Sequence, residues 1–432
     1  MSRSIGFWRC WALVVGSMIG SGVFMLPAVL APYGKYSVLG WLISGAGTIL
    51  IALTLGRLAR RSPHLGGPYA YVREAFGEIP GFYVGWGHWI SYVLATASIA
   101  VAFVGYLAFF WPQLASEPAL AGVTAIALIW ITTSVNISGV GSVGVLQLVT
   151  TLLKLLPLFI VAVGGIYLGD FESVPSKNPD EQSVIFLIAS MVMITMWAYT
   201  GIENGSVPAD DVIDPERTIP KALLFGTLTG TAIYVAAGIG VMALVPLDEL
   251  GKSTAPFADA AVYILGAAGA SLVAMGAMIS TLGAMNGNTL AAGMLSRAIA
   301  LDRLFPDRMG QLNNRGVPQF SLVLAGLIAS VLIGMNFSRG LVSIFELLIL
   351  LSTLATLLPY AASAVAELLL QQRDNSEGKS VHLIARLTAI AAFSFSLFSI
   401  VGSGLEIALQ GFILLLLGTP VWYFSRRSHQ IY

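Results

Sequence analysis

Long apolar stretches recur along this chain, and they constrain its fold more than any other feature. About 20 apolar residues in a helix cross the roughly 30 Å hydrocarbon core of a bilayer. Only 10% of the residues are charged, whereas soluble domains carry about 25%. The sequence therefore predicts an all-α membrane protein with twelve transmembrane helices, in windows at 11–32, 37–58, 80–110, 119–137, 142–168, 184–206, 219–245, 266–299, 319–337, 342–368, 384–402 and 407–425.

The placement of lysine and arginine predicts the orientation in the membrane. If both termini lie inside, 17 of the 22 basic residues fall on cytoplasmic segments. The outer segments then carry only Lys35, Lys177, Lys252 and Arg339. We therefore expect the protein in a bacterial inner membrane with both termini in the cytoplasm.

The composition excludes several classes of function. The formal net charge is zero and no basic run is present, which argues against a nucleic-acid partner. Cys10 is the only cysteine, and the four histidines are scattered along the chain. No spacing of side chains indicates a metal site, a cofactor or a catalytic constellation. We expect a protein that is not an enzyme and that holds neither metal nor cofactor.

Two predicted spans contain weak points. The first span carries glycines at positions 16, 20 and 22, each of which lowers helix propensity by about 1 kcal/mol. The sixth span has a comparable weak point from Trp197 to Asn204. The first and sixth spans each begin a block of five predicted helices. In inverted-repeat transporters, matching helix interruptions in the two halves of the chain indicate a substrate site near the middle of the membrane. The alternative is that these glycines only let helices pack closely.

The chemistry of such breaks suits an amino acid. Backbone N–H groups at the start of a half-helix attract a carboxylate, so we expect Ser21 and Gly22 to hold an α-carboxylate. Carbonyls at the end of a half-helix accept from an ammonium. We therefore expect the carbonyls near Ile19 and Thr200 to hold an α-amine.

An ionisable residue inside the membrane is energetically costly, so we treat each one as a candidate functional residue. Glu203 follows the second break, and a carboxylate removed from water takes up a proton more readily. Its role is either a proton-accepting gate or a structural hydrogen-bond acceptor. Lys154 lies in the middle of the fifth span, either as a functional cation or as a snorkelling side chain. His88, near the start of the third span, is either a packed residue or a gate residue.

The chain resembles the amino acid–polyamine–organocation superfamily, and within it the basic amino acid/polyamine antiporter branch that includes arginine/agmatine exchangers. The resemblance covers most of the chain in order. It is carried by Gly20-Ser21-Gly22-Val23-Phe24-Met25-Leu26-Pro27, Gly66-Gly67-Pro68-Tyr69-Ala70-Tyr71, Trp197 to Glu203, Asp214-Pro215-Glu216-Arg217-Thr218-Ile219-Pro220, Pro256-Phe257-Ala258-Asp259-Ala260-Ala261 and Pro359-Tyr360.

The resemblance implies a fold and a division of the chain. The family fold is an inverted repeat of five plus five helices with two peripheral helices, and helices 1 and 6 are broken. The corresponding segments here are 1–168 for helices 1–5, 169–368 for helices 6–10 and 369–432 for the peripheral helices 11 and 12. The resemblance also implies alternating-access exchange without sodium. Some relatives form homodimers through their last two helices.

The resemblance also implies roles for single residues. Ser21 and Gly22, next to Gly20, are similar to the carboxylate cradle of the family. Trp197 is similar to an aromatic wall, and Ser352 and Thr96 are similar to polar substrate contacts. Glu203 and Tyr360 resemble members of a cytoplasmic gate. Lys154 resembles a lysine whose ammonium replaces sodium beside the first break, as a fixed cation or a proton carrier.

Two residues depart from the pattern of arginine/agmatine exchangers. Asn288 occupies a position where those exchangers have a stacking tryptophan, and His88 occupies a gate position where they have a tyrosine. We therefore expect a neutral or small amino acid to be favoured over arginine or agmatine. Overall, the sequence predicts a secondary active transporter of amino acids or their amine products, by sodium-independent exchange or proton coupling. The alternative is a substrate-sensing receptor or a channel on a transporter scaffold.

Overall fold

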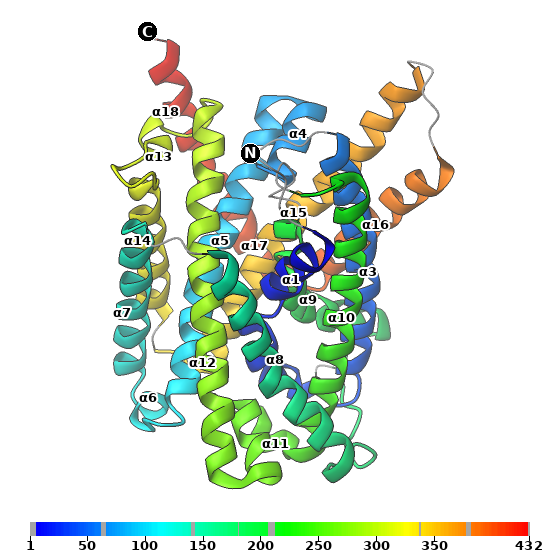
Figure 1. The fold of residues 1–432 in the computed structure, drawn as a ribbon, viewed down its shortest axis with the longest axis vertical. Helices are drawn as coiled ribbons and strands as arrows, with labels where there is room; N and C mark the ends of the chain where they lie inside the picture. The colour runs from blue at the N-terminus through cyan, green and yellow to red at the C-terminus, as the bar shows by residue number, and fades with distance from the viewer. Residues whose placement is uncertain are drawn as a thin grey trace.

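The structure is a computed structural model that describes residues 6–61, 66–139, 143–179, 181–205, 212–336, 338–376 and 382–430 (Figure 1). The side chains of Ser21, 143–153, 204–205, Pro215 and 428–430 lie outside this description. The described chain is built from helices without a β-strand; one isolated bridge joins Gly34 and Ser176. The prediction of an all-α membrane protein is confirmed.

The helices follow one another along the whole chain. Those of the first segment are α1 (Phe7–Met18), α2 (Ser21–Leu30), the 3₁₀ helix η1 (Ala31–Tyr33), α3 (Ser37–Arg61), α4 (Pro68–Phe76), α5 (Glu78–Leu107), α6 (Gln113–Ser116), α7 (Pro118–Ile137) and α8 (Val143–Leu168). The second segment contains α9 (Val184–Tyr199), the 3₁₀ helix η2 (Ile202–Gly205), α10 (Pro215–Leu244), α11 (Leu247–Leu250), α12 (Pro256–Leu301), α13 (Asp307–Gly310), α14 (Gln319–Asn336) and α15 (Leu341–Ser376). The chain ends with α16 (Leu383–Val401), α17 (Gly404–Leu416) and α18 (Gly418–Gln430).

Nine helices of the described chain are long and apolar enough to cross a membrane. A tenth span is formed if α1 and α2, which are bent by 41°, are counted together. The shorter apolar helices Lys154–Leu168 and Val184–Tyr199 lie in the fifth and sixth predicted windows. The count of twelve spans therefore stays a prediction.

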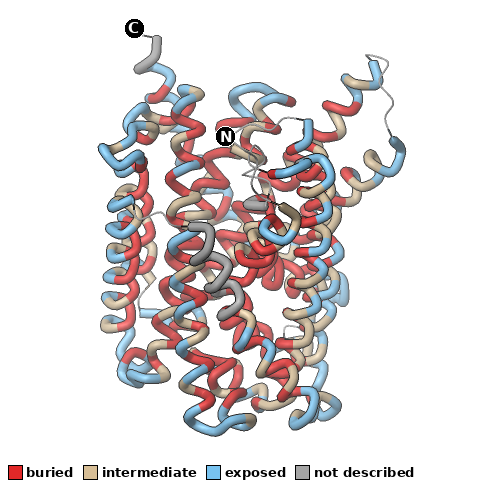
Figure 2. Tube along the Cα trace, in the orientation of Figure 1, coloured by how far each residue is buried: buried red, intermediate tan, exposed pale blue. Residues whose placement is uncertain are grey.

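The centre of the bundle is formed by α5 and α15. The apolar window of α5 is 83% buried, whereas the window of the last span, Gly404–Arg427, is only 6% buried. Figure 2 shows the same gradient, with buried segments in the middle and exposed segments outside. The central helices are therefore the ones that can position a site away from lipid.

Small residues let neighbouring helices approach closely, as is typical of membrane helices. A Cβ atom at Gly165 of α8 would lie 2.2 Å from Cα of Gly240 in α10. Any larger residue at this contact would push α8 away from α10. Since Lys154 also belongs to α8, this contact helps to fix its position relative to the other helices.

Two ends of the bundle can be distinguished. In Figure 1, α4, α13 and α18 lie at one end, and α6 and α11 lie at the opposite end. The first of these ends carries Arg57, Arg73 and Arg308, which the sequence assigns to cytoplasmic segments. The sides of the membrane that these ends face stay a prediction.

Candidate transport site

The breaks predicted in the first and sixth spans are present, and they lie against each other. α1 ends at Met18, Ile19 is extended, and α2 begins after Gly20. α9 ends at Tyr199, Thr200 is extended, and Gly201 has φ +93°, which favours glycine. The one proton of the Ser17 hydroxyl is shared between the Gly201 carbonyl oxygen at 2.9 Å and the Val14 carbonyl oxygen of its own helix at 3.0 Å. A direct hydrogen bond thus joins the two breaks.

Trp197 covers the start of α2. A Cβ atom at Gly22 would lie 2.8 Å from Trp197 Cδ1, so the indole ring is in close contact with the α2 backbone. Trp197 is 6% exposed, and its Nε1 has no acceptor among the described residues. A Cβ atom at Gly20 would lie 3.1 Å from Ala284 Cβ in α12. The first break is therefore enclosed between α9 and α12.

Glu203 is hydrogen-bonded from two central helices. Its Oε1 lies 3.2 Å from His88 Nε2 of α5, and Tyr360 of α15 donates to its Oε2 at 2.5 Å. The Tyr92 hydroxyl lies 3.5 Å from Oε1, and the Tyr92 ring stacks on His88 with centroids 4.9 Å apart. Glu203 is 3% exposed. Its carboxylate therefore closes the space between η2, α5 and α15.

The opposite end of α5 is closed by Tyr106. Its hydroxyl donates to the Phe24 carbonyl oxygen at 2.8 Å and accepts from the Phe257 N–H at 3.3 Å. These bonds join α5 to α2 and to the start of α12. Phe257 belongs to the first part of α12, which bends at Gly266.

Lys154 lies beside the first break. Its Nζ donates to the Gly16 carbonyl oxygen at 3.4 Å, and the residue is 2% exposed. The side chain also runs past Gly283, where a Cβ atom would lie 3.6 Å from Nζ. The ammonium is thus placed between α1 and α12 rather than at a membrane surface.

Asn288 and Thr96 form a polar cluster between α12 and α5. Asn288 Nδ2 donates to the Tyr92 carbonyl oxygen at 2.7 Å and to Thr96 Oγ1 at 2.8 Å. The Thr96 hydroxyl itself donates to the Tyr92 carbonyl oxygen at 2.9 Å. Tyr92 therefore contacts both this cluster and Glu203.

The arrangement has the parts that a carrier needs, namely paired helix breaks at the centre and hydrogen-bonded closures on both sides of them. A family model described as amino acid permease matches residues 5–417. This chain belongs to the amino acid permease family. The permease is accordingly a secondary transporter embedded in a membrane, and not an enzyme.

Comparison with known proteins gives bacterial relatives. The permease is 29% identical over 440 residues to the cadaverine/lysine antiporter of Escherichia coli (strain K12), covering 99% of this chain and 96% of the relative. It is 29% identical over 464 residues to the putative arginine/ornithine antiporter of Bacillus subtilis (strain 168), covering 99% and 98%. It is 27% identical over 422 residues to the putrescine transporter PotE of E. coli (strain K12), covering 98% and 96%. The predicted membership of an amino acid and polyamine transporter superfamily is confirmed.

The structure brings most of the predicted site residues together. Ile19, Gly20, Gly22, Trp197 and Thr200 surround the two breaks, whereas the side chain of Ser21 lies outside the described residues. The predicted gate residues His88 and Tyr360 both contact Glu203, and the predicted substrate contacts Thr96 of α5 and Asn288 of α12 contact each other. The substrate roles of all these residues stay predictions.

Two predicted polar contacts already use their hydroxyl protons within the protein. Ser352 donates to the Ser91 carbonyl oxygen at 2.8 Å, and Thr96 donates to the Tyr92 carbonyl oxygen at 2.9 Å. Each hydroxyl can therefore only accept a further hydrogen bond in this conformation.

Sequence reasoning missed Tyr92, although a signal for it was present. Tyr92 follows His88 by four residues and precedes Thr96 by four residues. Residues at this spacing share one face of a helix, so a site that includes both neighbours must also include Tyr92. Ser17 was missed as well, because its partner Gly201 lies 184 positions away.

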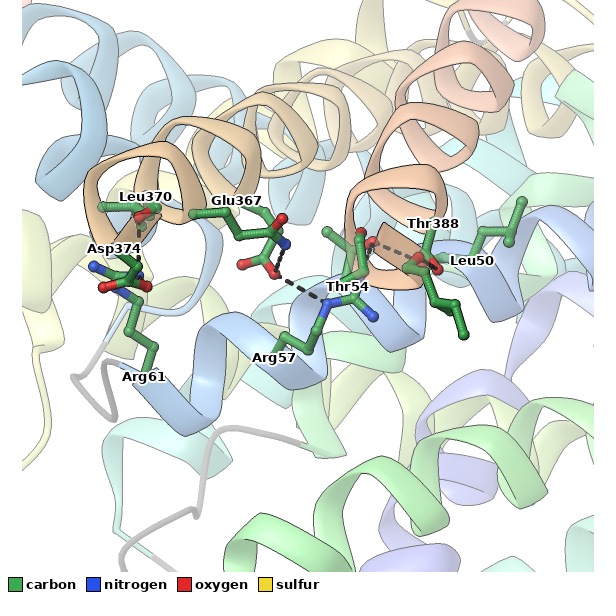
Figure 3. Close-up of polar contacts among 11 residues, drawn as sticks. Leu50, Thr54, Arg57, Arg61, Glu367, Leu370, Asp374 and Thr388 are labelled. Carbon is green, nitrogen blue, oxygen red and sulfur yellow. Dashed lines mark hydrogen bonds and ion pairs between the residues drawn. The ribbon is translucent and has the colours of Figure 1, made fainter. Parts of the chain in front are cut away.

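A second polar cluster lies at the end of α3 that carries arginines (Figure 3). Arg57 Nε pairs with Glu367 Oε1 of α15 at 3.0 Å, and Arg57 Nη2 donates to the Ala385 carbonyl oxygen of α16 at 3.3 Å. One turn along α3, Arg61 pairs with Asp374. The cluster ties α3 to α15 and α16 away from the breaks.

Proposed function

We propose that this permease exchanges amino acids or their decarboxylated amines across the bacterial inner membrane, without sodium, by alternating access. The joined helix breaks carry the proposal. The Ser17–Gly201 hydrogen bond connects two interrupted helices whose free backbone groups suit both ends of an α-amino acid. The names of the relatives support exchange, because two of the three are antiporters.

In this proposal the substrate lies at the breaks. The backbone N–H groups of Ser21 and Gly22 hold its carboxylate, because the start of α2 has no side-chain cap. The carbonyl oxygens near Ile19 and Thr200 hold its amine. Trp197 forms the wall beside it, and its unpaired indole N–H is available to a carboxylate oxygen. Thr96, Asn288 and Ser352 contact the remainder of the substrate.

The gate consists of His88, Glu203 and Tyr360. Opening toward α4 and α13 requires the Glu203 carboxylate to lose its bonds to both partners. A proton on Glu203 neutralises the carboxylate and weakens its bond to His88, so Glu203 is also our proposed site of proton coupling. The alternative role of Glu203 is a structural acceptor that never changes partners.

Lys154 replaces a sodium ion in this proposal. Its ammonium supplies a fixed positive charge at the Gly16 carbonyl oxygen, next to the end of α1. A carbonyl at a helix end attracts a cation, and a lysine provides that cation without an ion gradient. The same ammonium is our second candidate for a proton carrier.

The larger organisation belongs to the same proposal. Residues 1–168 and 169–368 form the two inverted repeats, 369–432 form the peripheral helices, and both termini lie in the cytoplasm. We keep a homodimer in the proposal because the last span is the least buried of the candidate spans. Measuring the mass of the purified protein in detergent distinguishes a dimer from a monomer that faces lipid.

Counterflow in sodium-free proteoliposomes tests the proposed function. Vesicles are loaded in turn with single amino acids and polyamines, and uptake of the same labelled compound is followed at two pH values. We expect saturable uptake that is accelerated by at least one internal compound and is lost in Trp197→Ala. Uptake that never saturates would indicate a channel, and binding without counterflow would indicate a receptor. Absence of counterflow with every compound would refute the proposed function.

A further inference from the structure

We infer that a cluster of ion pairs between α3 and α15 is a second closure of the transport path, which must separate each time the Glu203 end opens. The cluster consists of Arg57 and Arg61 of α3 with Glu367 and Asp374 of α15, and we call it the arginine latch (Figure 3). The inference rests on the proposed function, because a closure of this kind matters only in a protein that opens alternately to the two sides.

The latch follows from the spacing of charged residues on two helices. Arg57 and Arg61 are four residues apart, so they point from the same face of α3. Glu367 and Asp374 are about two turns apart and likewise share one face of α15. Arg57 Nε lies 3.0 Å from Glu367 Oε1. Arg61 pairs with Asp374 and also donates to the Leu370 carbonyl oxygen at 3.2 Å. The two faces therefore interlock at two successive positions.

The rest of α3 is packed tightly against α9 and α10. The hydroxyl oxygens of Ser44 in α3 and Thr195 in α9 lie 2.7 Å apart. A Cβ atom at Gly45 of α3 would lie 2.5 Å from Thr231 Oγ1 of α10. Helices this close cannot move past one another without repacking. We therefore treat α3, α9 and α10 as a first group of helices.

In contrast, α15 is bound to α4 and α5. The Ser352 hydroxyl of α15 donates to the Ser91 carbonyl oxygen of α5 at 2.8 Å. Further along α15, Arg373 Nη2 donates to the Ala75 carbonyl oxygen at the end of α4 at 3.0 Å. We therefore treat α4, α5 and α15 as a second group.

The arginine latch joins these two groups. Within α3 and α15, both of which the structure describes in full, every hydrogen bond and ion pair between the two helices involves Arg57 or Arg61. Arg61 Nε also lies 3.9 Å from Glu74 Oε1 of α4, which belongs to the second group. A movement that separates the two groups at this end must therefore break the latch.

The latch lies beyond the gate on the same helix. Glu367 follows Tyr360 by seven residues, so it lies about two turns, or roughly 10 Å, further along nearly the same face of α15. Glu203 holds α15 at Tyr360, and Arg57 holds it at Glu367. Breaking the bond between Glu203 and Tyr360 therefore leaves α15 held two turns away, and both closures must open for a substrate to leave.

The partners of the latch suit a contact that opens repeatedly. A buried charge that loses all its partners is strongly destabilising. Arg57 Nη2 also donates to Thr54 Oγ1 of its own helix at 3.4 Å, and Gln371 Nε2 donates to Glu367 Oε1 within α15 at 2.6 Å. Each half of the pair therefore keeps a hydrogen-bond partner after separation. The Arg57 side chain is also 25% exposed, so water can take the place of the carboxylate.

Reversible crosslinking tests the inference. Arg57→Cys and Glu367→Cys are combined in a Cys10→Ala background and joined with a bis-methanethiosulfonate reagent, whose bridges dithiothreitol cleaves. The matched control combines Arg60→Cys with Glu216→Cys. This pair also consists of an arginine and a glutamate, with Arg60 Nη2 3.3 Å from Glu216 Oε2, but it joins α3 to α10 within the first group.

Counterflow in proteoliposomes is measured for each variant before crosslinking, after crosslinking and after dithiothreitol, and mass spectrometry of the peptides verifies each bridge. We expect the bridge at the latch to abolish counterflow and dithiothreitol to restore it. The bridge in the control should leave counterflow unchanged. Arg61→Cys with Asp374→Cys, one turn further along α3, gives the same test if the first variant fails to fold.

The possible failures are distinguishable. Full counterflow with the latch bridged would overturn the inference, because α3 and α15 would then stay together throughout exchange. Loss of counterflow in the bridged control would also overturn it, because α3 and α10 would then have to move apart. Absence of counterflow in the unmodified protein with every amino acid and amine would refute the proposed function, and the inference with it.

Discussion

Replacing Gly22 by alanine should displace Trp197 and slow transport while leaving the fold intact. The added Cβ atom would lie 2.8 Å from Trp197 Cδ1, 3.0 Å from its Nε1 and 3.2 Å from Ala198 Cα. Carbon atoms in contact normally lie about 3.5–4.0 Å apart, so the ring must move by roughly 0.7 Å or α2 must shift. Neither movement is easy, because Trp197 is buried and Ala198 contributes backbone atoms.

The size of the effect follows from the cost of overpacking a core. One extra methyl group in a well-packed region costs about 1–3 kcal/mol. If this cost falls on the conformation that binds substrate, it corresponds to about a 5- to 150-fold loss of transport efficiency. Gly334→Ala in α14 is the matched control, because a Cβ atom there would have no neighbour within 4 Å. At both positions alanine stabilises the helix by about 1 kcal/mol relative to glycine, so the two variants share this effect.

The assay measures the initial rate of counterflow for both variants, together with their melting temperatures in detergent. We expect Gly22→Ala to lose rate with a small change in melting temperature, and Gly334→Ala to retain the rate of the unmodified protein. Equal rates in the two variants would show that the contact between Gly22 and Trp197 does not matter for transport. A large fall in the melting temperature of Gly22→Ala would place the effect in folding instead.

Three further substitutions test other parts of the site. Tyr360→Phe removes one hydrogen bond to the Glu203 carboxylate, worth about 1.5–3 kcal/mol, so the gate should open more readily. Cysteines introduced on the cytoplasmic side of the gate should then react faster with a labelling reagent. An unchanged labelling rate would contradict this prediction. Lys154→Met should lower the exchange rate at least about tenfold. Thermal stability should change little, because an apolar chain replaces a desolvated ammonium. An unchanged exchange rate would favour the alternative that Lys154 is a snorkelling side chain. Glu367→Ala leaves Arg57, which is partly exposed, without its carboxylate and should reduce stability by about 1–3 kcal/mol; a thermal melt that matches the unmodified protein would refute a structural role for this pair.

The helices and their breaks could be predicted because they depend on local sequence. Runs of apolar residues specify spans, and Gly20 and Gly201 weaken the helices where the breaks occur. The contact between Glu203 and Tyr360 could be predicted only from resemblance, since it joins residues 157 positions apart. Local sequence patterns do not indicate which residues far apart in the chain come into contact.

Other features of the site depend on atoms that the sequence does not describe. The hydrogen bond that Asn288 donates to Tyr92 depends on a backbone carbonyl oxygen of another helix, which no residue pattern reveals. The bond from Ser17 to Gly201 likewise has a backbone acceptor. Sequence patterns predict which side chains are available, whereas the backbone determines which of their protons remain free.

The closures at the two ends of α5 have a consequence for leakage. Opening the Tyr106 end breaks two neutral hydrogen bonds, together worth about 1–3 kcal/mol, and opening the Glu203 end breaks the charge-assisted bonds to His88 and Tyr360, together worth about 3–6 kcal/mol. If the two ends open independently, the free-energy cost of a path open at both ends is the sum of the two costs, about 4–9 kcal/mol. A path open at both ends would then exist in roughly one molecule in 700 to one in a few million. Because Tyr106 closes one side of the breaks and Glu203 with its partners His88 and Tyr360 closes the other, a path open at both ends is rare, and ions do not leak across while substrates are exchanged.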